Sequence, residues 1–366
     1  MAERLGVGIV GLSAQGGWAA RSHLPALRGL EQFEVRGFTG SSPESVRVTA
    51  DHYGIDRGFT DPGELARQED IDLVVVTVKA RAHAEQLKSI LPAGKPVFCE
   101  WPFCRDVTEA RDILALFEAA GARTAIGLQA RHSPQVRFVR DLVAEGEIGG
   151  ILSTTLVTSI PYWGSTAGSR DAYLLDGANG STLVSIPVGH TLDGLEFALG
   201  EITQLSATTA VRQPHVVHRE THETLLKTTP DQVAIHGLLR GGIVFSFHCR
   251  GGVNSRTSAF FWEINGTRGD ITLRSPCGEL QYNEPEILLT RADGAPKPVA
   301  APARYRGAVP DALGPEPRSV AHTYLRVFDD LATGSCLVPD FSRAVRHREL
   351  IDMIERAGRT GACQSV

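Results

Sequence analysis

Short apolar runs alternate with segments of helical periodicity in the first third of the chain. Residues 5–12 (LGVGIVGL) and 71–78 (IDLVVVTV) are almost entirely apolar, and the second run is rich in β-branched side chains. Strands buried on both faces, as in parallel sheets, have this composition. The pattern predicts strands at 5–12, 33–39, 71–78, 96–100 and 123–128, and helices at 16–30, 43–53, 82–91 and 107–120. This alternation predicts a doubly wound parallel sheet, which binds ligands at the carboxyl ends of its strands.

The pattern changes after about residue 130. One helix is predicted at 135–145, and strands follow at 151–159, 202–211, 232–239, 242–249, 258–265, 269–274 and 286–290. Turn signals such as Arg240-Gly-Gly242 separate these strands, so a mostly antiparallel open sheet with helices on one face is expected. A connector rich in Pro, Ala and Gly (294–317) precedes two predicted helices, at 318–332 and 340–357.

Length and composition fit a two-domain globular protein. The chain has 366 residues, of which 42% are hydrophobic and 22% charged, with a net charge of −5. No basic block suggests contact with nucleic acid, and no apolar run is long enough to cross a membrane. The sequence begins without a signal-peptide pattern, and its six cysteines include no C-x-x-C pair, so we expect a cytoplasmic protein with reduced thiols. We expect domains at 1–130 and 131–335, with 336–366 as a C-terminal helix that packs back on the first.

A glycine-rich turn joins the first predicted strand to the first helix. Compared with the dinucleotide motif G-x-G-x-x-G, Gly11 and Gly16 occupy the outer positions and Ser13 the middle one. Such a turn lets the amides at the helix N-terminus bind a pyrophosphate, so we predict a Rossmann domain that binds NAD(P). A purely structural turn is the alternative. The candidate contacts are Gly11, Ser13, Gln15, Gly16, Gly17 and Trp18, together with Thr77 at the end of a later strand.

The end of the second strand bears on the choice of cofactor. NAD-selective sites usually carry Asp or Glu there, whereas this chain has Thr39, Ser41 and Ser42. No carboxylate repels a 2′-phosphate, and the hydroxyls and the next helix N-terminus could bind one. NADP is therefore the preferred expectation, with NAD as the alternative. These residues could equally well only cap the helix, and the two interpretations are compatible.

Several longer motifs carry a family resemblance. The glycine turn, Glu100-Trp-Pro102 and Gly189-His-Thr-Leu-Asp193 resemble the Gfo/Idh/MocA family of sugar and cyclitol dehydrogenases over nearly the whole chain. A branch that includes the fungal galactose-regulon repressor is more similar still. The shared stretches are Gly11-Leu-Ser-Ala-Gln-Gly-Gly-Trp18, Phe98-Cys-Glu-Trp-Pro102, Gly127-Leu-Gln-Ala-Arg-His-Ser-Pro134 and Lys227-Thr-Thr-Pro-Asp231.

The resemblance implies roles for several of these residues. It places Glu100 near the nicotinamide ribose, and Gln129 and Arg131 facing the nicotinamide and the substrate. His83 matches a family position, although an ordinary helix histidine is the alternative. Two residues of the family's catalytic set are missing. Trp101 replaces a lysine that assists proton transfer, and the Asp expected four residues before His190 is missing from the span Ser185-Ile-Pro-Val-Gly-His190.

The remaining proton carriers are His190 and Tyr162. An imidazole titrates near neutrality, while a phenol donates a proton readily but is a poor base. A structural histidine and an aromatic loop residue are the alternatives. Asp193 lies one helical turn after His190 and could orient its ring, or could simply favour the start of the helix. The expected substrate contacts are Trp101, Tyr162, Trp163, Asn179, His190 and Asp193.

Other chemistries find little support. His215, His218 and His222 have helical spacing, but no carboxylate or Cys completes a ligand set, so no metal is expected. No G-x-S-x-G sequence suggests a serine nucleophile.

Two functions fit these residues. The first is an NAD(P)-dependent oxidoreductase that acts on a small polar substrate (sugar-like, keto or imine) with Trp101 in place of the usual lysine. The alternative is a non-catalytic NAD(P)-binding ligand sensor, a co-regulator like the galactose-regulon repressor. The resemblance also implies a homodimer or homotetramer formed through the open sheet face.

Overall fold

The computed structural model describes residues 4–253, 259–292 and 294–366, and it divides into two compact units. Unit 1 contains Met1–Gln129 and Gly307–Arg348, and unit 2 contains Ala130–Arg306 and Glu349–Val366. The chain therefore enters each unit twice. Residues 307–335, predicted from the sequence as part of the second domain, group with unit 1, and residues 349–366 group with unit 2.

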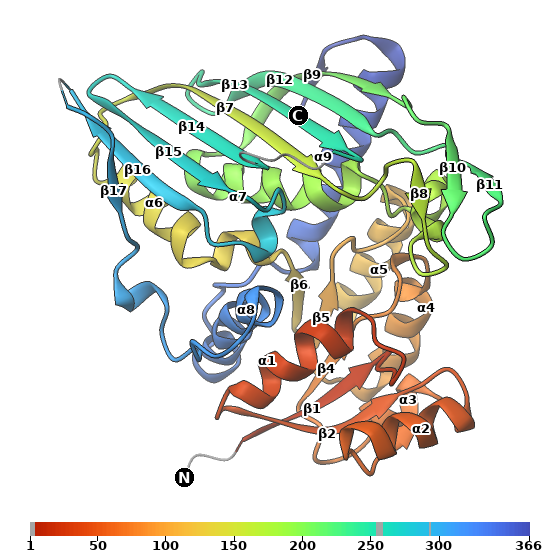
Figure 1. Cartoon of the computed structure of the whole chain (residues 1–366). Coiled ribbons are helices and arrows are strands. Elements are labelled where there is room, and N and C mark those ends of the chain that lie inside the picture. Colours follow the sequence, from red (N-terminus) through yellow and green to blue (C-terminus); the bar gives the residue numbers. More distant parts are fainter. Residues whose placement is uncertain (1–3, 254–258, 293) are drawn as a thin grey trace. The chain divides into compact units, whose positions relative to one another are not determined.

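Unit 1 is built on a six-stranded parallel sheet (Figure 1). Its strand order is β3-β2-β1-β4-β5-β6, so the direction of winding reverses between β1 and β4. The strands are β1 (Leu5–Val10), β2 (Phe33–Thr39), β3 (Gly58–Phe59), β4 (Leu73–Val76), β5 (Val97–Glu100) and β6 (Thr124–Gly127). The doubly wound sheet predicted from the sequence is confirmed, and its reversal point is where such sheets bind ligands.

Helices cover both faces of this sheet. They are α1 (Leu24–Gly29), α2 (Pro43–Tyr53), α3 (Pro62–Ala66), α4 (Ala80–Ile90), α5 (Val107–Ala119) and α8 (Pro315–Thr333). The helix predicted at 16–30 is shorter and begins with a π-helical turn, η1 (Ala19–His23), with Pro25 in the first turn of α1. From α8, Val320, Ala321 and Tyr324 join the apolar core that contains Phe33 and Phe98.

Unit 2 is built on a nine-stranded mixed sheet with the order β17-β16-β15-β14-β7-β13-β12-β9-β18. The central pair β7–β13 is parallel and the other pairs are antiparallel, in agreement with the mostly antiparallel sheet predicted. The strands are β7 (Ile151–Ile160), β9 (Ile202–Ala210), β12 (Gln232–Leu239), β13 (Val244–Gly251), β14 (Phe260–Gly266), β15 (Gly269–Ser275), β16 (Glu286–Arg291), β17 (Lys297–Val299) and β18 (Gln364–Ser365). The predicted start of one strand, residue 258, lies outside the described residues.

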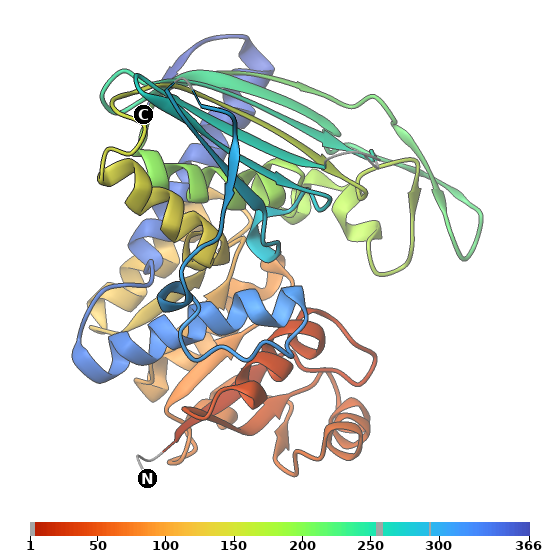
Figure 2. The ribbon, with the colours of Figure 1, turned by 60° about the vertical axis from the view of Figure 1, so that its left-hand side comes forward.

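One face of the nine-stranded sheet is covered by α6 (Pro134–Ala144) and α7 (Gly189–Leu199) (Figure 2). Side chains alternate across β13, where Phe245 and Phe247 are buried under the helices and Val244, Ser246 and His248 are exposed. The apolar face of the sheet therefore points to the helices, and the opposite face mixes polar and apolar side chains.

The sequence pattern did not predict a small three-stranded sheet in unit 2. Its strands are β8 (Thr166–Ala167), β10 (His215–His218) and β11 (Thr224–Leu226). The prediction failed because the β10 segment is short and histidine-rich, with one side chain, Val216, that packs into a cluster with Ala167 and Leu175. The connector 294–317 likewise contains β17. The last two helices are slightly longer than predicted, with α9 spanning Phe341–Thr360.

Among the described residues, no helix combines the length and hydrophobicity that a membrane span requires.

Gly237 in β12 should tolerate no side chain. A Cβ atom there would lie 1.9 Å from the backbone oxygen of Gln204 on β9. We expect Gly237→Ala to lower the free energy of unfolding by roughly 2–4 kcal/mol, because the paired backbones must separate. The control Gly241→Ala changes a turn residue with φ of 84° and open space around it, so about 1 kcal/mol of backbone strain is expected. Equal losses in urea unfolding would contradict this account.

Candidate functional site

The turn after β1 requires glycine at Gly11, where a side chain would collide with its neighbour. Gly11 has φ of 98°, and a Cβ atom on it would lie 2.6 Å from Cγ1 of Val78. Its amide donates to the hydroxyl of Thr39 at 3.2 Å, which joins the ends of β1 and β2. Gly16 and Gly17 also have positive φ, and a Cβ at Gly17 would meet no atom within 4 Å. The turn thus leaves open space in front of the first helix, as a bound phosphate requires.

The other residues predicted for the nucleotide form contacts within the turn and the strand ends. Ser13 Oγ accepts from the amide of Gln15 at 3.2 Å. Thr77 Oγ1 donates to the carbonyl of Val10 at 2.7 Å. Trp18 precedes η1, where no side chain caps the amides, and the guanidinium of Arg21 lies 5.5 Å from the centre of its ring. These residues shape the turn and leave its helix end to a ligand.

The three residues predicted to bind a 2′-phosphate differ in their exposure and in their hydrogen bonds. Thr39 is buried and its hydroxyl serves Gly11, whereas Ser41 is exposed. Ser42 caps α2, and its Oγ accepts from the amide of Ser45 at 3.2 Å. Glu44 follows in the first turn, and hydrogen bonding and charge from Arg47 hold the pKa of this carboxyl below its usual value. The expected capping role of Ser42 is therefore present in the structure.

A buried polar chain lies at the carboxyl ends of β5 and β6. Glu100 Oε1 accepts from Gln129 Nε2 at 2.7 Å and lies 2.9 Å from His23 Nε2. His23 Nδ1 is 2.6 Å from the hydroxyl of Tyr324. The sequence pointed to Glu100 and Gln129, but not to His23 or Tyr324. Their only sequence signal is an isolated polar residue on the apolar face of each helix.

His83 and Trp101 are held inside unit 1. His83 Nε2 lies 2.8 Å from the carbonyl of Val78, and its Nδ1 lies 3.4 Å from Cys99 Sγ. Nδ1 also lies 3.0 Å from the carbonyl of Phe103, so a backbone carbonyl faces each ring nitrogen. Burial lowers the pKa of His83. Trp101, which precedes a cis peptide bond, is buried with its ring 4.9 Å from that of His347. Both side chains brace the ends of β4 and β5.

In unit 2, His190 occupies the second position of α7. The preceding π-helical turn, η6 (Val184–Val188), is capped reciprocally by two hydroxyl side chains. Ser185 Oγ accepts from the amide of Thr182 at 2.8 Å, and Thr182 Oγ1 accepts from the amide of Ser185 at 3.0 Å. Ser185, in the span where the family's Asp is missing, thus holds the start of this helical segment, and His190 lies buried five residues later.

Arg131 and Asp193 form a close bidentate ion pair. Arg131 Nε donates to Asp193 Oδ2 at 2.8 Å, and a second guanidinium nitrogen contacts Oδ1. The Asp193 side chain is fully buried, and the Arg131 guanidinium also lies over the ring of Phe197. The pair links the segment before α6 to α7, so both side chains are committed to one another.

A buried ion pair anchors the loop that carries Tyr162 and Trp163. Lys227 Nζ lies 2.9 Å from Asp231 Oδ2, with both side chains fully buried. The same ammonium donates to the carbonyl of Trp163 at 2.5 Å. Asp231 also accepts from the amides of Arg212 and Gln213. The motif Lys227-Thr-Thr-Pro-Asp231 is therefore a clamp that ties the loop after β7 to the strand ends.

The two aromatic side chains of this loop, Tyr162 and Trp163, differ in their exposure. Trp163 has φ of 61°, which is unusual for a bulky residue, and its ring is buried. Tyr162 is 42% exposed, so its phenol is accessible. Further along the loop, Asn179 Nδ2 donates to the carbonyl of Tyr173 at 3.0 Å.

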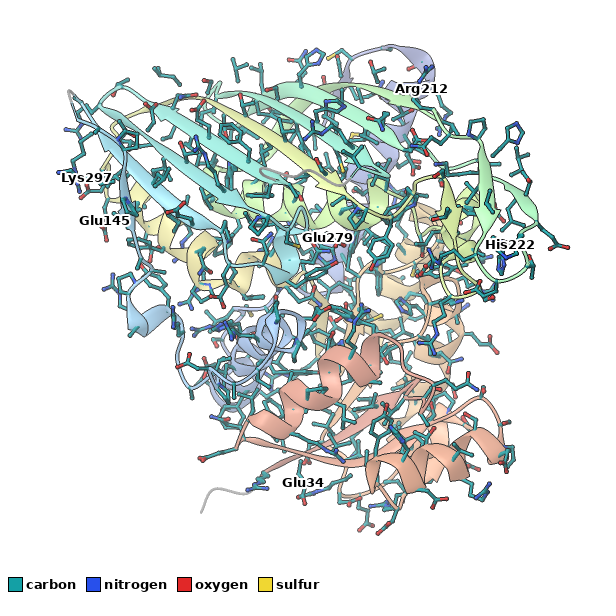
Figure 3. All side chains as sticks on the ribbon, in the orientation of Figure 1. Glu34, Glu145, Arg212, His222, Glu279 and Lys297 are labelled. Atoms are coloured by element: carbon teal, nitrogen blue, oxygen red, sulfur yellow. The ribbon has the colours of Figure 1, made fainter. Side chains whose placement is uncertain are left out.

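The three histidines singled out in the sequence lie on one hairpin of unit 2. His222 is at the tip between β10 and β11 (Figure 3). His218 accepts from the amide of Thr221 at 3.2 Å, and His215 is exposed. Within the residues that the structure describes, no group of three His, Cys, Asp or Glu side chains is arranged to hold a metal ion.

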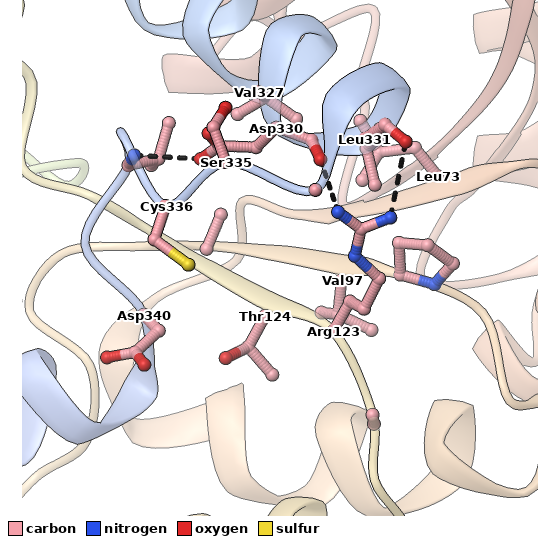
Figure 4. Close-up of a pocket in the computed structure, with 15 residues that line it drawn as sticks. Leu73, Val97, Arg123, Thr124, Val327, Asp330, Leu331, Ser335, Cys336 and Asp340 are labelled. Atoms are coloured by element: carbon pink, nitrogen blue, oxygen red, sulfur yellow. Dashed lines mark hydrogen bonds between the residues drawn. The ribbon is translucent and has the colours of Figure 1, made fainter.

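A cavity of about 290 Å³ lies at the amino ends of β4, β5 and β6 in unit 1 (Figure 4). Arg123 donates to two backbone carbonyls of α8, and the Asp330 carboxylate accepts from the amides of Leu337 and Val338. Ligands of doubly wound sheets bind at the opposite strand ends, so this cavity is separate from the candidate cofactor site.

Comparison with known proteins finds a different family model for each part of the chain. Residues 5–128 match the oxidoreductase family with an NAD-binding Rossmann fold, and residues 134–275 match the C-terminal domain of Gal80p. Dehydrogenase aclE of Aspergillus oryzae is 31% identical over 302 residues, which cover 79% of this chain and 82% of that protein. The chain belongs to the Gfo/Idh/MocA oxidoreductase family. This confirms the resemblance found in the sequence.

The Gal80-like branch is also represented. The galactose/lactose metabolism regulatory protein GAL80 of Kluyveromyces lactis is 30% identical over 297 residues, covering 76% of this chain and 65% of that protein. The structure of a super-repressor mutant of Gal80p from Saccharomyces cerevisiae has a TM-score of 0.88 at 22% identity, covering 100% of this chain and 98% of that chain. Levoglucosan dehydrogenase in complex with NADH and levoglucosan has a TM-score of 0.84 at 19% identity, covering both chains fully. At these identities the two structures establish the fold.

The clamp should show a pH dependence. Burial alone would raise the pKa of Asp231, but Lys227 and the two backbone amides outweigh it and leave this pKa below its usual value. The pair therefore stabilises the fold above the ordinary carboxyl pKa, and this contribution is lost as the pH falls through the lowered value. We expect Asp231→Asn to cost roughly 3–5 kcal/mol at neutral pH, with a difference from the wild type that shrinks below about pH 4.

Thermal unfolding across this pH range tests the expectation. The matched control is Asp171→Asn, which breaks the exposed Arg219–Asp171 pair in the same part of the unit. Its expected cost is under about 1 kcal/mol. A loss for Asp231→Asn as small as that of the control would contradict the clamp.

Proposed function

We propose that the protein binds a nicotinamide dinucleotide in unit 1 and acts as an oxidoreductase on a small polar substrate. The substrate class is sugar-like, keto or imine. The observation that carries the proposal is the glycine turn, in which Gly11, Gly16 and Gly17 have positive φ and open space lies at Gly17 ahead of an uncapped helix start. Relatives named D-apiose dehydrogenase and 1,5-anhydro-D-fructose reductase, at 25% identity, support this substrate class.

The preferred cofactor is NADP, with NAD as the alternative. Ser41 is exposed and Ser42 caps α2, so hydroxyls and a helix start face the position where a 2′-phosphate would lie. Glu44 is the one charge that opposes this preference in the first turn of α2, and its pairing with Arg47 reduces that effect. The remaining contacts proposed for the dinucleotide come from Ser13, Gln15, Trp18 and Thr77.

The proposed chemistry assigns proton transfer to two side chains of unit 2. When bound, the nicotinamide supplies or accepts the hydride. His190 takes the proton from the substrate hydroxyl, or returns it, because imidazole titrates near neutral pH. Tyr162 supplies an accessible phenol for the same oxygen. Trp101 can act neither as the acid nor as the base, because an indole N–H neither releases its proton nor accepts one near neutral pH.

The other proposed substrate contacts divide into binding and positioning. Trp163 and Asn179 line the loop that carries Tyr162, and the Lys227–Asp231 clamp fixes that loop. Arg131 and Asp193 hold α7 through their mutual ion pair, so in this proposal they position His190, one turn before Asp193 on that helix.

A second candidate function is a ligand sensor that binds the dinucleotide without turnover. Trp101, which replaces the family's lysine, packs on His347, and the family's Asp is missing from the span 185–190. The match of residues 134–275 to the Gal80p C-terminal domain also favours it. Such a protein would transmit the bound state to another protein.

We also propose that a second copy of the chain covers the open face of the nine-stranded sheet, which gives a homodimer or homotetramer. Val244 is 54% exposed there, and Arg274 lies over the ring of Phe261. An uncovered sheet face with apolar side chains favours association with a like face.

Dinucleotide binding is the first test. We expect purified protein to bind NADPH or NADH, observed as a change in the ligand's fluorescence on titration. Gly17→Val should weaken binding at least about tenfold, because a branched side chain fills the space ahead of the helix and strains the backbone. Gly94→Ala, at a positive-φ position remote from the turn, is the control and should bind like the wild type. Failure of the wild type to bind either dinucleotide at saturation would refute the proposal.

Turnover separates the two candidate functions. With sugar, keto and imine substrates, cofactor absorbance should change with the wild type. His190→Ala should lower kcat/KM by about 10²–10⁴ with unchanged dinucleotide affinity, as expected for loss of a general base. Tyr162→Phe should have a smaller effect. The control is His248→Ala on the exposed sheet face. Binding without turnover of any substrate would instead favour the sensor.

A further inference from the structure

The buried polar chain of unit 1 links helix α8 to the glycine turn. Tyr324 on α8 is fully buried, and the hydroxyl lies 2.6 Å from Nδ1 of His23. His23 is the last residue of the π-helical turn η1, which begins at Ala19, directly after Gly17 and Trp18. Its Nε2 lies 2.9 Å from Glu100 Oε1 at the end of β5, although off the line of a well-aligned hydrogen bond. Three segments far apart in the sequence thus meet through their polar atoms.

The positions of the hydrogen atoms in this group of buried polar side chains follow from the chemistry of Tyr324 and His23. Within the described part of the chain, His23 is the single polar partner of the Tyr324 hydroxyl. Burial and the nearby Glu100 raise the pKa of Tyr324 well above its usual value, so the phenol keeps its proton. That proton is therefore donated to His23 Nδ1, which leaves the hydrogen of a neutral ring on Nε2, facing Glu100. The Glu100 carboxylate is thus stabilised in its charged form by His23 and Gln129.

Two further observations indicate that this group of buried polar side chains faces a ligand. A Cβ atom at Gly127 would lie 2.8 Å from the Glu100 carboxyl atoms, so only glycine leaves room for this carboxylate. Gln129 donates its amide hydrogen to Glu100, which fixes the amide orientation. Its Oε1 is then a buried acceptor with no hydrogen-bond partner among the described residues. An unsatisfied buried acceptor costs free energy, and a ligand N–H or O–H would satisfy it.

The position of Glu100 suits the nicotinamide end of a dinucleotide. β5 is two strands from β1, a separation of about 10 Å along the carboxyl edge of the sheet. A dinucleotide whose pyrophosphate lies at the glycine turn can reach this point with one nucleoside. The nicotinamide ring is cationic when oxidised and neutral when reduced. A buried carboxylate nearby therefore favours the oxidised form, because charge interactions are strong at low dielectric.

We propose that His23 and Tyr324 are positioning residues that set the preference of the protein between oxidised and reduced dinucleotide. They act through Glu100 by holding its carboxylate charged and in place. The inference rests on the proposed function, because it requires that unit 1 binds a dinucleotide. It adds helix α8, which follows the six-stranded sheet of unit 1 in the sequence, to the elements that determine cofactor binding.

A pair of substitutions at one position tests the proposal. Gln reaches as far as His Nε2 and can still donate to Glu100, whereas Asn matches His Nδ1 and can pair only with Tyr324. The measured quantity is the ratio of Kd for the oxidised dinucleotide to Kd for the reduced one. We expect His23→Asn to raise this ratio about tenfold and His23→Gln to leave it within about threefold of the wild type. A merely structural role predicts equal ratios for both variants, whatever their stability.

Tyr324→Phe removes a single oxygen and provides a second measurement if the His23 variants fail to fold. We expect it to raise the same ratio about threefold, because the ring of His23 loses the donor that orients it. Tyr305→Phe is the matched control, since its hydroxyl donates to Asp141 in unit 2. If the wild type binds both forms, and if His23→Asn and Tyr324→Phe keep the wild-type ratio of Kd values, this inference is overturned and the proposed function stands. A wild type that binds neither form would overturn the proposed function together with it.

Discussion

The carboxyl end of β1 imposes the constraint on which unit 1 depends: the chain must turn where no side chain fits. Val78 closes one side of Gly11, and the Thr39 hydroxyl receives its amide on the other. β2 and β4, the two neighbours of β1 in the sheet, thus end against one residue. A larger residue at this point would separate the strand ends and close the space before the first helix. Strand packing and the open helix start therefore have the same cause.

The two motifs that lack the family's lysine and Asp make structural contacts instead. Trp101 fills its position with a ring that packs on His347, and Ser185 caps the turn that leads to His190. Neither motif supplies a group that ionises near neutrality, so in the proposed function proton transfer falls to His190 and Tyr162 of unit 2. Lys227 and Asp231 are also ionisable, but their charges are neutralised within the loop clamp.

Periodicity was sufficient to predict the two sheets, because long apolar runs and regular alternation depend on local sequence. It did not predict β8, β10 and β11, whose pairing depends on a few buried side chains such as Val216. For the site, the glycine turn and the capping role of Ser42 were visible in the sequence, because both are local. The partners of Glu100 and Asp193 were not, since His23 is 77 residues from Glu100 and a bidentate ion pair has no local signature. Contacts between distant elements need the fold itself.

The division of the chain between its units has a consequence for synthesis on the ribosome. Phe33 and Phe98 belong to the segment translated first, yet part of their cover is Tyr324 and its neighbours on α8, more than two hundred residues later. A nascent chain that has completed only its first six strands exposes that apolar surface while eight of the nine strands of the second sheet are being made. Assistance from a chaperone, or a delay in final packing until termination, is the natural outcome of this order.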